Sequence, residues 1–381
     1  LMKRAPTWDI VWLFIATRVL LMLVTYIGYI LLTEDKYSHM PVDINTFFIL
    51  WERWDAVRYV AIARHGYQTA ADFAFFPLYP LLIATIAYPL GDWSTFLVGV
   101  IISNAALLGA LFILYQIAAD SGGEQLARRT LLYLCIFPTA FFFFTAYNES
   151  LLLLFTAGTF LALRRQHWWL AGLLGFLAAL TRSAGVFLVV PYLYELWVAR
   201  ESVIASLRNT LLGILPVVLI PLGTALYCFY CWKVTGNPLV FATVQDQWSR
   251  HLSWPWQGIW QALFEFFWNQ PFGSFNQVHV LLDLSATLGF IALAVVGRNR
   301  LRTSYTLWIG LLLLYYLLSP SVEQHDPLIS NQRFVLEMFP GFITLAMLGI
   351  QHPRLHQALL WIFPALLATL TLLFIMNSWM V

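Results

Sequence analysis

The segment Trp51-Glu-Arg-Trp-Asp-Ala-Val-Arg-Tyr-Val-Ala-Ile-Ala-Arg-His-Gly-Tyr67 carries the densest cluster of charged residues in an otherwise apolar chain. At about 100° per residue, a helix predicted over residues 51–63 has two different faces. The polar face carries Glu52, Asp55, Arg58 and Tyr59, and the apolar face carries Trp54, Ala56, Val57, Val60 and Ala61. This pattern predicts an amphipathic helix on a membrane surface. Carboxylates beside a guanidinium suit a site that deprotonates a hydroxyl and holds an anion, although a solvated helix without chemistry has the same pattern.

The composition of the whole chain indicates an integral membrane protein. Of its 381 residues, 60% are hydrophobic and 10% are charged, whereas soluble proteins have about 25% charged residues. No basic run indicates nucleic-acid binding, and the net charge is only +2. Cys228 and Cys231 form a C-x-x-C pair inside an apolar run, and we interpret them as apolar filler rather than a zinc or redox site.

Apolar runs that suit a membrane recur along the chain. We predict an all-α polytopic membrane protein with about 11 transmembrane helices, in a range of about 9 to 13. The runs cover residues 10–32, 94–118, 130–146, 150–163, 168–180, 184–198, 211–232, 278–296, 305–318, 334–350 and 358–376. Several are shorter than the ~20 residues that cross ~30 Å of hydrocarbon, so we expect broken helices. Residues 73–89, interrupted by Pro77 and Pro80, are expected to form a re-entrant or short second helix.

The first run is too long for a signal-peptide core and is expected to remain as a signal-anchor helix. Basic residues between the runs then predict the orientation, because cytoplasmic segments are enriched in them. The clusters are Lys3/Arg4, Arg128/Arg129, Arg164/Arg165, Arg200/Arg208, Arg298/Arg300/Arg302 and Arg354. The polar motifs fall on the opposite face, within external loops such as 33–72 and 235–276. We predict one integral membrane domain over 1–381, with a catalytic transmembrane module at 10–234 and C-terminal helices at 277–381.

Asp55 is the leading candidate for a catalytic base. Aromatic neighbours such as Trp51, Trp54 and Tyr59 destabilise the charged form of a carboxylate, which favours proton transfer. The alternative is an interfacial aspartate that only pairs with Arg58.

Three further charged residues interrupt or border apolar runs. Arg182 lies between two such runs and needs an anionic partner, for which a lipid phosphate or Glu149 would serve. Glu149, in Tyr147-Asn-Glu-Ser150, equally suits the first turn of a helix. Arg333 precedes another run, where an arginine can bind an anion or extend to the membrane interface.

The predicted loop after residue 235 contains Gln245, Trp248 and Arg250 at near-helical spacing. Amide and indole groups suit sugar hydroxyls and ring faces, but an ordinary interfacial helix has the same residues. The histidines His65, His279 and His325, like Asp326, show no metal-ligand spacing. These positions therefore give no support for a metal site, and the missing P-loop and dinucleotide fingerprint give no indication of ATP use. We predict no cofactor, and the family resemblance described next implies no obligatory metal.

With these residues in view, the chain resembles the PIG-V family of mannosyltransferases in the GT-C superfamily of membrane glycosyltransferases. The matching segments are Arg53-Trp-Asp-Ala with Tyr59, Ile62-Ala63 and Gly66-Tyr67, Phe75-Phe-Pro-Leu-Tyr-Pro-Leu-Leu82, Tyr147-Asn-Glu-Ser150, Thr181-Arg-Ser-Ala-Gly185, Gly236-Asn-Pro-Leu-Val-Phe241 with Gln245 and Trp248, and Gln332-Arg-Phe-Val-Leu-Glu-Met-Phe-Pro340. The family more often has threonine at Asn148 and asparagine at Ala184, so these two departures leave substrate identity open.

The resemblance implies a GT-C-type fold and transfer of mannose, with inversion, from a polyprenyl- or dolichyl-phosphate-mannose donor. A lipid or glycan hydroxyl would be the acceptor, and membrane lipids would surround the enzyme. Asp55 would be the base, and the donor phosphate would contact Arg58, Arg182 and Arg333. The expected substrate-binding residues are Glu52, Trp54, Tyr59, Tyr79, Tyr147, Glu149, Gln245, Trp248 and Arg250.

The resemblance places the active site at the periplasmic or outer face of a bacterial plasma membrane, or in the lumen if the protein resides in the endoplasmic reticulum. Three other functions fit the same composition. A lipid or sugar transporter also has buried charges and broken helices. A GT-C enzyme for another sugar, or a non-catalytic subunit that binds lipid or a partner enzyme, would have a similar sequence.

Overall fold

The computed structural model describes residues 7–37, 44–201, 211, 213–321 and 325–379. Lys3, Arg4 and Arg208, which we used to predict the orientation, lie outside these residues, as does part of the predicted loop 33–72.

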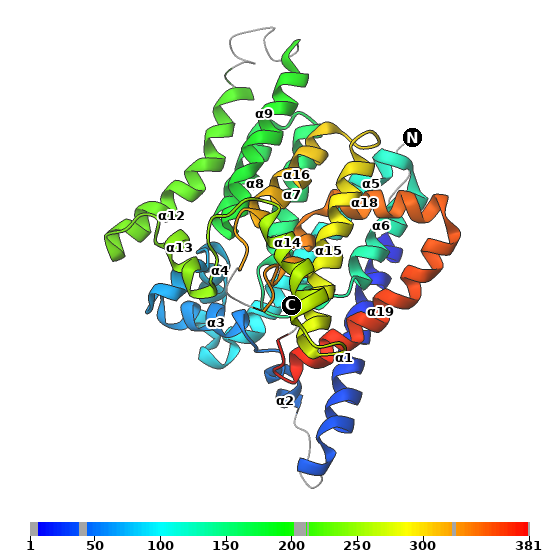
Figure 1. The fold of residues 1–381 in the computed structure, drawn as a ribbon. Helices are drawn as coiled ribbons and strands as arrows, with labels where there is room; N and C mark the ends of the chain where they lie inside the picture. The colour runs from blue at the N-terminus through cyan, green and yellow to red at the C-terminus, as the bar shows by residue number, and fades with distance from the viewer. Residues whose placement is uncertain (1–6, 38–43, 202–210, 212, 322–324, 380–381) are drawn as a thin grey trace. The chain divides into compact units, whose positions relative to one another are not determined.

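The described chain is built from helices, which confirms the predicted all-α fold class (Figure 1). The α-helices are α1 (Thr7–Tyr37), α2 (Ile44–Ile49), α3 (Asp55–His65), α4 (Leu78–Ala87), α5 (Thr95–Gly122), α6 (Glu124–Ile136), α7 (Glu149–Arg164), α8 (Trp168–Thr181), α9 (Val189–Val198), α12 (Leu219–Thr235), α13 (Val240–Thr243), α14 (Gln257–Phe264), α15 (Phe275–Gly297), α16 (Thr303–Leu317), α17 (Asn331–Phe334), α18 (Phe339–Gln351) and α19 (Pro353–Ile375). Short 3-10 helices include η1 (Ala70–Ala74), η5 (Ser183–Leu188) and η7 (Val244–Trp248).

Five helices of the described chain are long and apolar enough to cross a membrane, which confirms an integral membrane protein. These helices are Thr7–Leu32, Asp92–Gly122, Leu215–Thr235, Phe275–Gly297 and Pro353–Ile375. A sixth span results if Asn331–Glu337 and Phe339–Gln351, which are bent by 89°, count as one. The bend falls just before Pro340, whose ring nitrogen has no hydrogen to donate.

Other apolar helices are too short to span a bilayer alone. They are Leu78–Leu90, Trp168–Thr181, Ser183–Val198 and Thr303–Leu317. The expected short helix after Phe73 is therefore present as α4, which has 10 residues. Because broken helices leave the pairing of segments into spans open, the number of about 11 crossings remains a prediction.

The chain folds as two compact units. The first unit combines residues 1–64, 80–150 and 345–380, and the second combines residues 65–79 and 151–344. In the first unit, the N-terminal helix α1 packs against the C-terminal helix α19 and against α5 and α6 (Figure 1). Tyr133 Oη and His356 Nδ1 lie 2.8 Å apart and join α6 to α19.

In the second unit, the closest helix pair is α8 and α12. Small residues allow this approach, as is common between membrane helices. A Cβ atom on Gly223 would lie 2.7 Å from the carbonyl oxygen of Phe176, and one on Gly172 would lie 2.3 Å from that of Pro216. Since backbone atoms cannot move aside as a flexible side chain can, both positions require glycine.

The amphipathic helix near the start of the chain differs in detail from its prediction. Helix α3 begins at Asp55 rather than at Trp51, because Trp54 has a left-handed backbone with φ of 52° that interrupts helical geometry. The two faces also differ, since Tyr59 is buried and Val57 is 47% exposed. Tyr59 of the predicted polar face therefore points into the protein, and Val57 of the predicted apolar face points outward.

Candidate active site

The first unit brings Asp55 together with the predicted motif that begins at Tyr147. The Tyr147 hydroxyl accepts a hydrogen bond from the backbone N–H of Asp55 at 3.2 Å. The same hydroxyl donates to the backbone carbonyl of Arg53, also at 3.2 Å. The Tyr147 side chain is fully buried, and its own carbonyl oxygen accepts a 2.7 Å bond from Ser103 Oγ. A buried phenol thus fixes the residue at which α3 begins.

A second contact anchors the turn that precedes Asp55. Trp51 is fully buried, with its ring centroid 4.6 Å from that of Phe144 in an edge-on arrangement. Thr145 Oγ1 donates a 2.7 Å hydrogen bond to the Trp51 carbonyl oxygen. The segment 51–55 is therefore held at both ends by residues just before Asn148, and this arrangement places the Asp55 carboxylate on a rigid support.

The other predicted site residues of the first unit have different environments. Glu149 is the first residue of α7, which agrees with its predicted place in the first turn of a helix. Its side chain is fully buried. Arg58 is exposed on α3. The Trp54 ring lies 5.1 Å from that of Trp379, and the Tyr59 ring lies 6.4 Å from that of Tyr147. Tyr59 therefore packs against the ring of Tyr147, whereas the Trp54 ring packs against that of Trp379.

Glu52 lies within the same turn and is half-buried. Burial raises the pKa of its carboxyl group, whereas the positive charges of Arg64 and Arg53 lower it. Burial is the largest of these effects. The side chain therefore retains a proton to a higher pH than a solvated glutamate does.

The second unit gathers three arginines around one phenyl ring. The guanidinium carbon of Arg182 lies 4.7 Å from the Phe334 ring centroid, and those of Arg250 and Arg333 lie at 5.2 Å and 6.0 Å. The Phe334 ring also stacks with Tyr316, at a centroid distance of 4.3 Å and an angle of 15°. The arginines come from three distant parts of the sequence, so this cluster exists only in the folded chain.

Arg182 is held by a buried carboxylate. Its Nη1 lies 3.0 Å from Glu337 Oε1, and the Glu337 side chain is completely buried. The Tyr316 hydroxyl donates a 2.6 Å hydrogen bond to Glu337 Oε2. The predicted need of Arg182 for an anionic partner is thus met by Glu337, a pairing that we did not predict.

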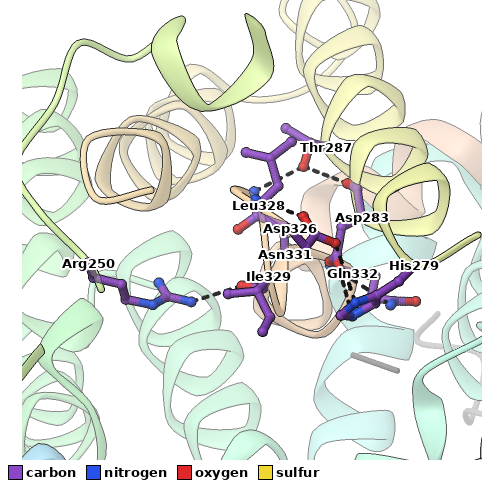
Figure 2. Close-up of polar contacts among 9 residues, drawn as sticks. All are labelled: Arg250, His279, Asp283, Thr287, Asp326, Leu328, Ile329, Asn331 and Gln332. Atoms are coloured by element: carbon purple, nitrogen blue, oxygen red, sulfur yellow. Dashed lines mark hydrogen bonds and ion pairs between the residues drawn. The ribbon is translucent and has the colours of Figure 1, made fainter. Parts of the chain in front are cut away.

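A backbone carbonyl positions Arg250, and Arg333 is buried within α17. Arg250 Nη2 donates a 2.8 Å hydrogen bond to the carbonyl oxygen of Ile329 (Figure 2). Burial lowers the pKa of Arg250; Tyr315 opposes this change, and the positive charge of Arg182 adds to it. Arg333 is only 4% exposed, within the short helix α17. The cluster therefore holds mutually repelling cations close together, which favours binding of an anion.

The remaining predicted residues support the fold around this cluster. Trp248 packs against the apolar group of the second unit that includes Phe73 and Tyr227, and its carbonyl oxygen accepts a hydrogen bond from Ser321 Oγ. Gln245 Nε2 donates to the Phe241 carbonyl at 3.3 Å. These contacts give Trp248 and Gln245 structural partners, and their predicted contact with a sugar remains a prediction, as does that of the fully buried Tyr79.

Sequence reasoning missed Phe334 and Glu337 as site residues, although both lie in the segment that contains Arg333. The sequence does indicate that Glu337 is unusual, because a carboxylate inside an apolar run needs a cationic partner. It also missed Asp283, which accepts a 2.7 Å hydrogen bond from the backbone N–H of Gln332.

Comparisons with known proteins support the mannosyltransferase family that the sequence motifs predict. Residues 10–231, more than half of the chain, match the family described as Mannosyltransferase (PIG-V). GPI mannosyltransferase 2 of Schizosaccharomyces pombe is 27% identical over 224 residues, which are 53% of this chain and 48% of that protein. GPI alpha-1,6-mannosyltransferase 2 of Rattus norvegicus is 34% identical over 148 residues, which are 35% of this chain and 29% of that protein. The chain thus aligns with less than half the length of each of these relatives.

A solved structure confirms the predicted GT-C-type fold. The crystal structure of ArnT from Cupriavidus metallidurans bound to undecaprenyl phosphate superposes with a TM-score of 0.51 and 15% sequence identity. The match covers 83% of this chain and 60% of ArnT.

Proposed function

Since the chain belongs to the mannosyltransferase (PIG-V) family, as its motifs predict, we propose that it transfers a mannosyl unit from a polyprenyl- or dolichyl-phosphate-mannose donor. The acceptor is a hydroxyl group of a lipid-linked molecule or a glycan. The names of the relatives support mannose as the sugar. The undecaprenyl phosphate bound to ArnT supports a polyprenyl phosphate as the donor's lipid.

The convergence of Arg182, Arg250 and Arg333 on Phe334 carries the proposal. Guanidinium groups form paired hydrogen bonds to phosphate oxygens, and their charge is not lost at physiological pH. Phe334 orients the three groups through cation–π contacts. In this proposal the donor phosphate binds at the arginine cluster of the second unit, with Glu337 fixing Arg182 in place.

We propose Asp55 as the base that performs the proton transfer, as the resemblance implies. The acceptor oxygen attacks the anomeric carbon, and the bond between that carbon and the phosphate oxygen breaks with inversion. The hydroxyl proton passes to the Asp55 carboxylate, and the bonding electrons leave with the lipid phosphate. A positioned general base contributes about 10² to 10⁴ in rate, and arginines that stabilise the departing charge add to this.

The reaction is assigned to the external face of a bacterial plasma membrane, or to the lumenal face if the membrane is that of the endoplasmic reticulum. The distribution of lysine and arginine between apolar runs supports this face. The polyprenyl tail of the donor would then remain in the hydrocarbon layer beside the apolar helices.

Donor kinetics test the arginine cluster. Purified protein is given radiolabelled polyprenyl-phosphate-mannose and a membrane lipid extract, and transfer is measured against donor concentration. Arg250→Ala and Arg333→Ala should each raise the KM for the donor by about tenfold or more, because a hydrogen bond to a charged group contributes about 1.5–3 kcal/mol. Arg298→Ala is the matched control, since Arg298 is an exposed arginine of the same unit. An unchanged donor KM in both cluster variants would remove the phosphate-binding role.

A further inference from the structure

A second cluster of chemically active side chains lies in the second unit. His279 and Asp283 are four residues apart on α15, and Asp326 comes from the segment before α17. His279 Nε2 lies 3.5 Å from Asp283 Oδ2, and His279 Nδ1 lies 3.7 Å from Asp326 Oδ2. One ligand-type atom from each residue lies within 4.8 Å of the other two. Figure 2 shows the three side chains pointing toward one another.

These groups are buried and incompletely hydrogen-bonded. Asp283 is 0% exposed, Asp326 is 3% exposed and His279 is 8% exposed. Within the described part of the chain, Asp326 Oδ2 and His279 Nε2 have no hydrogen-bond partner. Two buried carboxylates so close together are costly unless a cation or well-placed donors compensate them. The two atoms without hydrogen bonds are also the ones that face the other members of the cluster.

The remaining oxygen atoms of the two carboxylates are fixed by the backbone. Asp283 Oδ1 accepts a 2.7 Å hydrogen bond from Gln332 N–H, and Asp326 Oδ1 accepts a 2.9 Å bond from Leu328 N–H. Asp283 Oδ2 accepts a further, 3.5 Å hydrogen bond from Gln332 Nε2, whereas Asp326 Oδ2 faces the cluster without a hydrogen-bond partner among the described residues. Such hydrogen bonds are typical of carboxylates that bind a metal while a neighbouring group orients them.

We propose that His279, Asp283 and Asp326 bind a divalent transition-metal cation, for which Zn²⁺ is the best match. A ligand set of one imidazole nitrogen and two carboxylate oxygens suits Zn²⁺. Mg²⁺ and Ca²⁺ prefer sites in which all ligand atoms are oxygen. With Zn–N and Zn–O bonds of about 2.0–2.2 Å, ligand atoms in a tetrahedral site lie about 3.4 Å apart. Since the ligand atoms lie within 4.8 Å of one another, the cluster reaches that size if its separations contract by at most about 1.4 Å. Three protein ligands leave one position for water.

The cation would act by positioning the neighbouring arginine cluster. Asp283 binds the backbone of Gln332, which directly precedes Arg333. Asn331 Nδ2 donates a 3.0 Å hydrogen bond to Thr287 Oγ1, one turn along α15 from Asp283. Fixing Asp283 and Asp326 with one ion would therefore hold α17 against α15. This inference concerns metal binding and does not depend on the proposed sugar transfer.

Metal content and thermal stability test the site without an activity assay. The protein is purified with a tag that contains no histidine and without chelator, and its zinc content is measured by mass spectrometry. We expect about one equivalent per chain, lost after treatment with EDTA and restored by added Zn²⁺. Because a ligand that binds the folded state stabilises it, restoring zinc should also raise the unfolding midpoint. Mn²⁺ and Mg²⁺ are added separately to test the selectivity.

Variants locate the site on the chain. His279→Gln and Asp326→Asn should each reduce bound zinc at least tenfold and abolish the zinc-dependent rise of the midpoint. His251→Gln is the matched control, because His251 also lies near a carboxylate, 3.3 Å from Asp246, but both are much more exposed. If a cluster variant does not fold, the zinc titration of the EDTA-treated wild type decides. Wild-type protein that binds no zinc, or cluster variants that retain it, would overturn the proposal.

Discussion

The hydroxyl group of Tyr147 accepts a hydrogen bond from the backbone N–H of Asp55, although the two residues are 92 positions apart in the sequence. The same oxygen donates to the carbonyl of Arg53. One buried side chain therefore defines where the helix that carries the proposed base begins. The proposed activity depends on this support, because a general base must be held within hydrogen-bond reach of the proton that it removes.

Tyr147→Phe should lower both the stability of the protein and its rate of mannose transfer. The change leaves the ring in place but removes the oxygen that satisfies Asp55 N–H and Arg53 C=O, so we expect a loss of about 1–2 kcal/mol in unfolding free energy. We also expect a lower kcat with a nearly unchanged donor KM, since the donor phosphate is assigned to the other unit. Thermal unfolding and initial-rate kinetics measure the two effects. Tyr88→Phe is the control, because Tyr88 is 90% exposed; equal behaviour of the two variants would contradict the account.

The Arg182–Glu337 pair should show strong coupling. Removing one member of a buried ion pair typically costs about 3–5 kcal/mol, because the other charge loses its compensation. Glu337→Gln and Arg182→Gln should therefore each lower the unfolding midpoint, and the double variant should cost less than their sum. A double-mutant cycle measured by thermal unfolding checks this. Strictly additive effects would show that the 3.0 Å contact contributes no coupling energy.

Stability should depend on pH through Glu52. Its folded-state pKa is raised, chiefly by burial, so the folded protein binds this proton more tightly than the unfolded chain does. The resulting stabilisation is complete below the unfolded value of about 4.5 and is lost as pH rises through the raised value. Glu52→Gln, which is neutral at every pH, should therefore gain stability relative to wild type as pH increases from about 4 to 7.5. Unfolding midpoints at both pH values measure this, and a relative loss with increasing pH would contradict it.

Much of the fold could be predicted because apolar runs are local properties of the sequence. The runs 150–163 and 168–180 correspond closely to α7 and α8. The predicted run 334–350, in contrast, is bent by 89° between Glu337 and Phe339, and Pro340 lies in the first turn of α18 after this bend. The start of α3 was mispredicted because Trp54 has a left-handed backbone, which is uncommon for any residue other than glycine and which the apolar pattern does not indicate.

The site could be predicted only in part. Arg182 and Arg333 could be identified from the sequence because a charged side chain in or beside an apolar run is energetically costly and usually has a partner or a function. Their convergence on Phe334 was not predictable, since it results from packing between distant segments. The pair His279 and Asp283 has the spacing of neighbours on one helix face, but only the fold shows that Asp326 joins it.

The most direct test of the central claim is mannose transfer by Asp55→Asn. Wild type and variant are compared at equal amounts of folded protein, with radiolabelled polyprenyl-phosphate-mannose and a membrane lipid extract. Asp92→Asn is the control, since Asp92 is an exposed carboxylate of the same unit. The account predicts that wild type and Asp92→Asn transfer mannose, whereas Asp55→Asn is at least about 10²-fold slower and remains folded. Transfer by folded Asp55→Asn at the wild-type rate would contradict the assignment of Asp55 as the base.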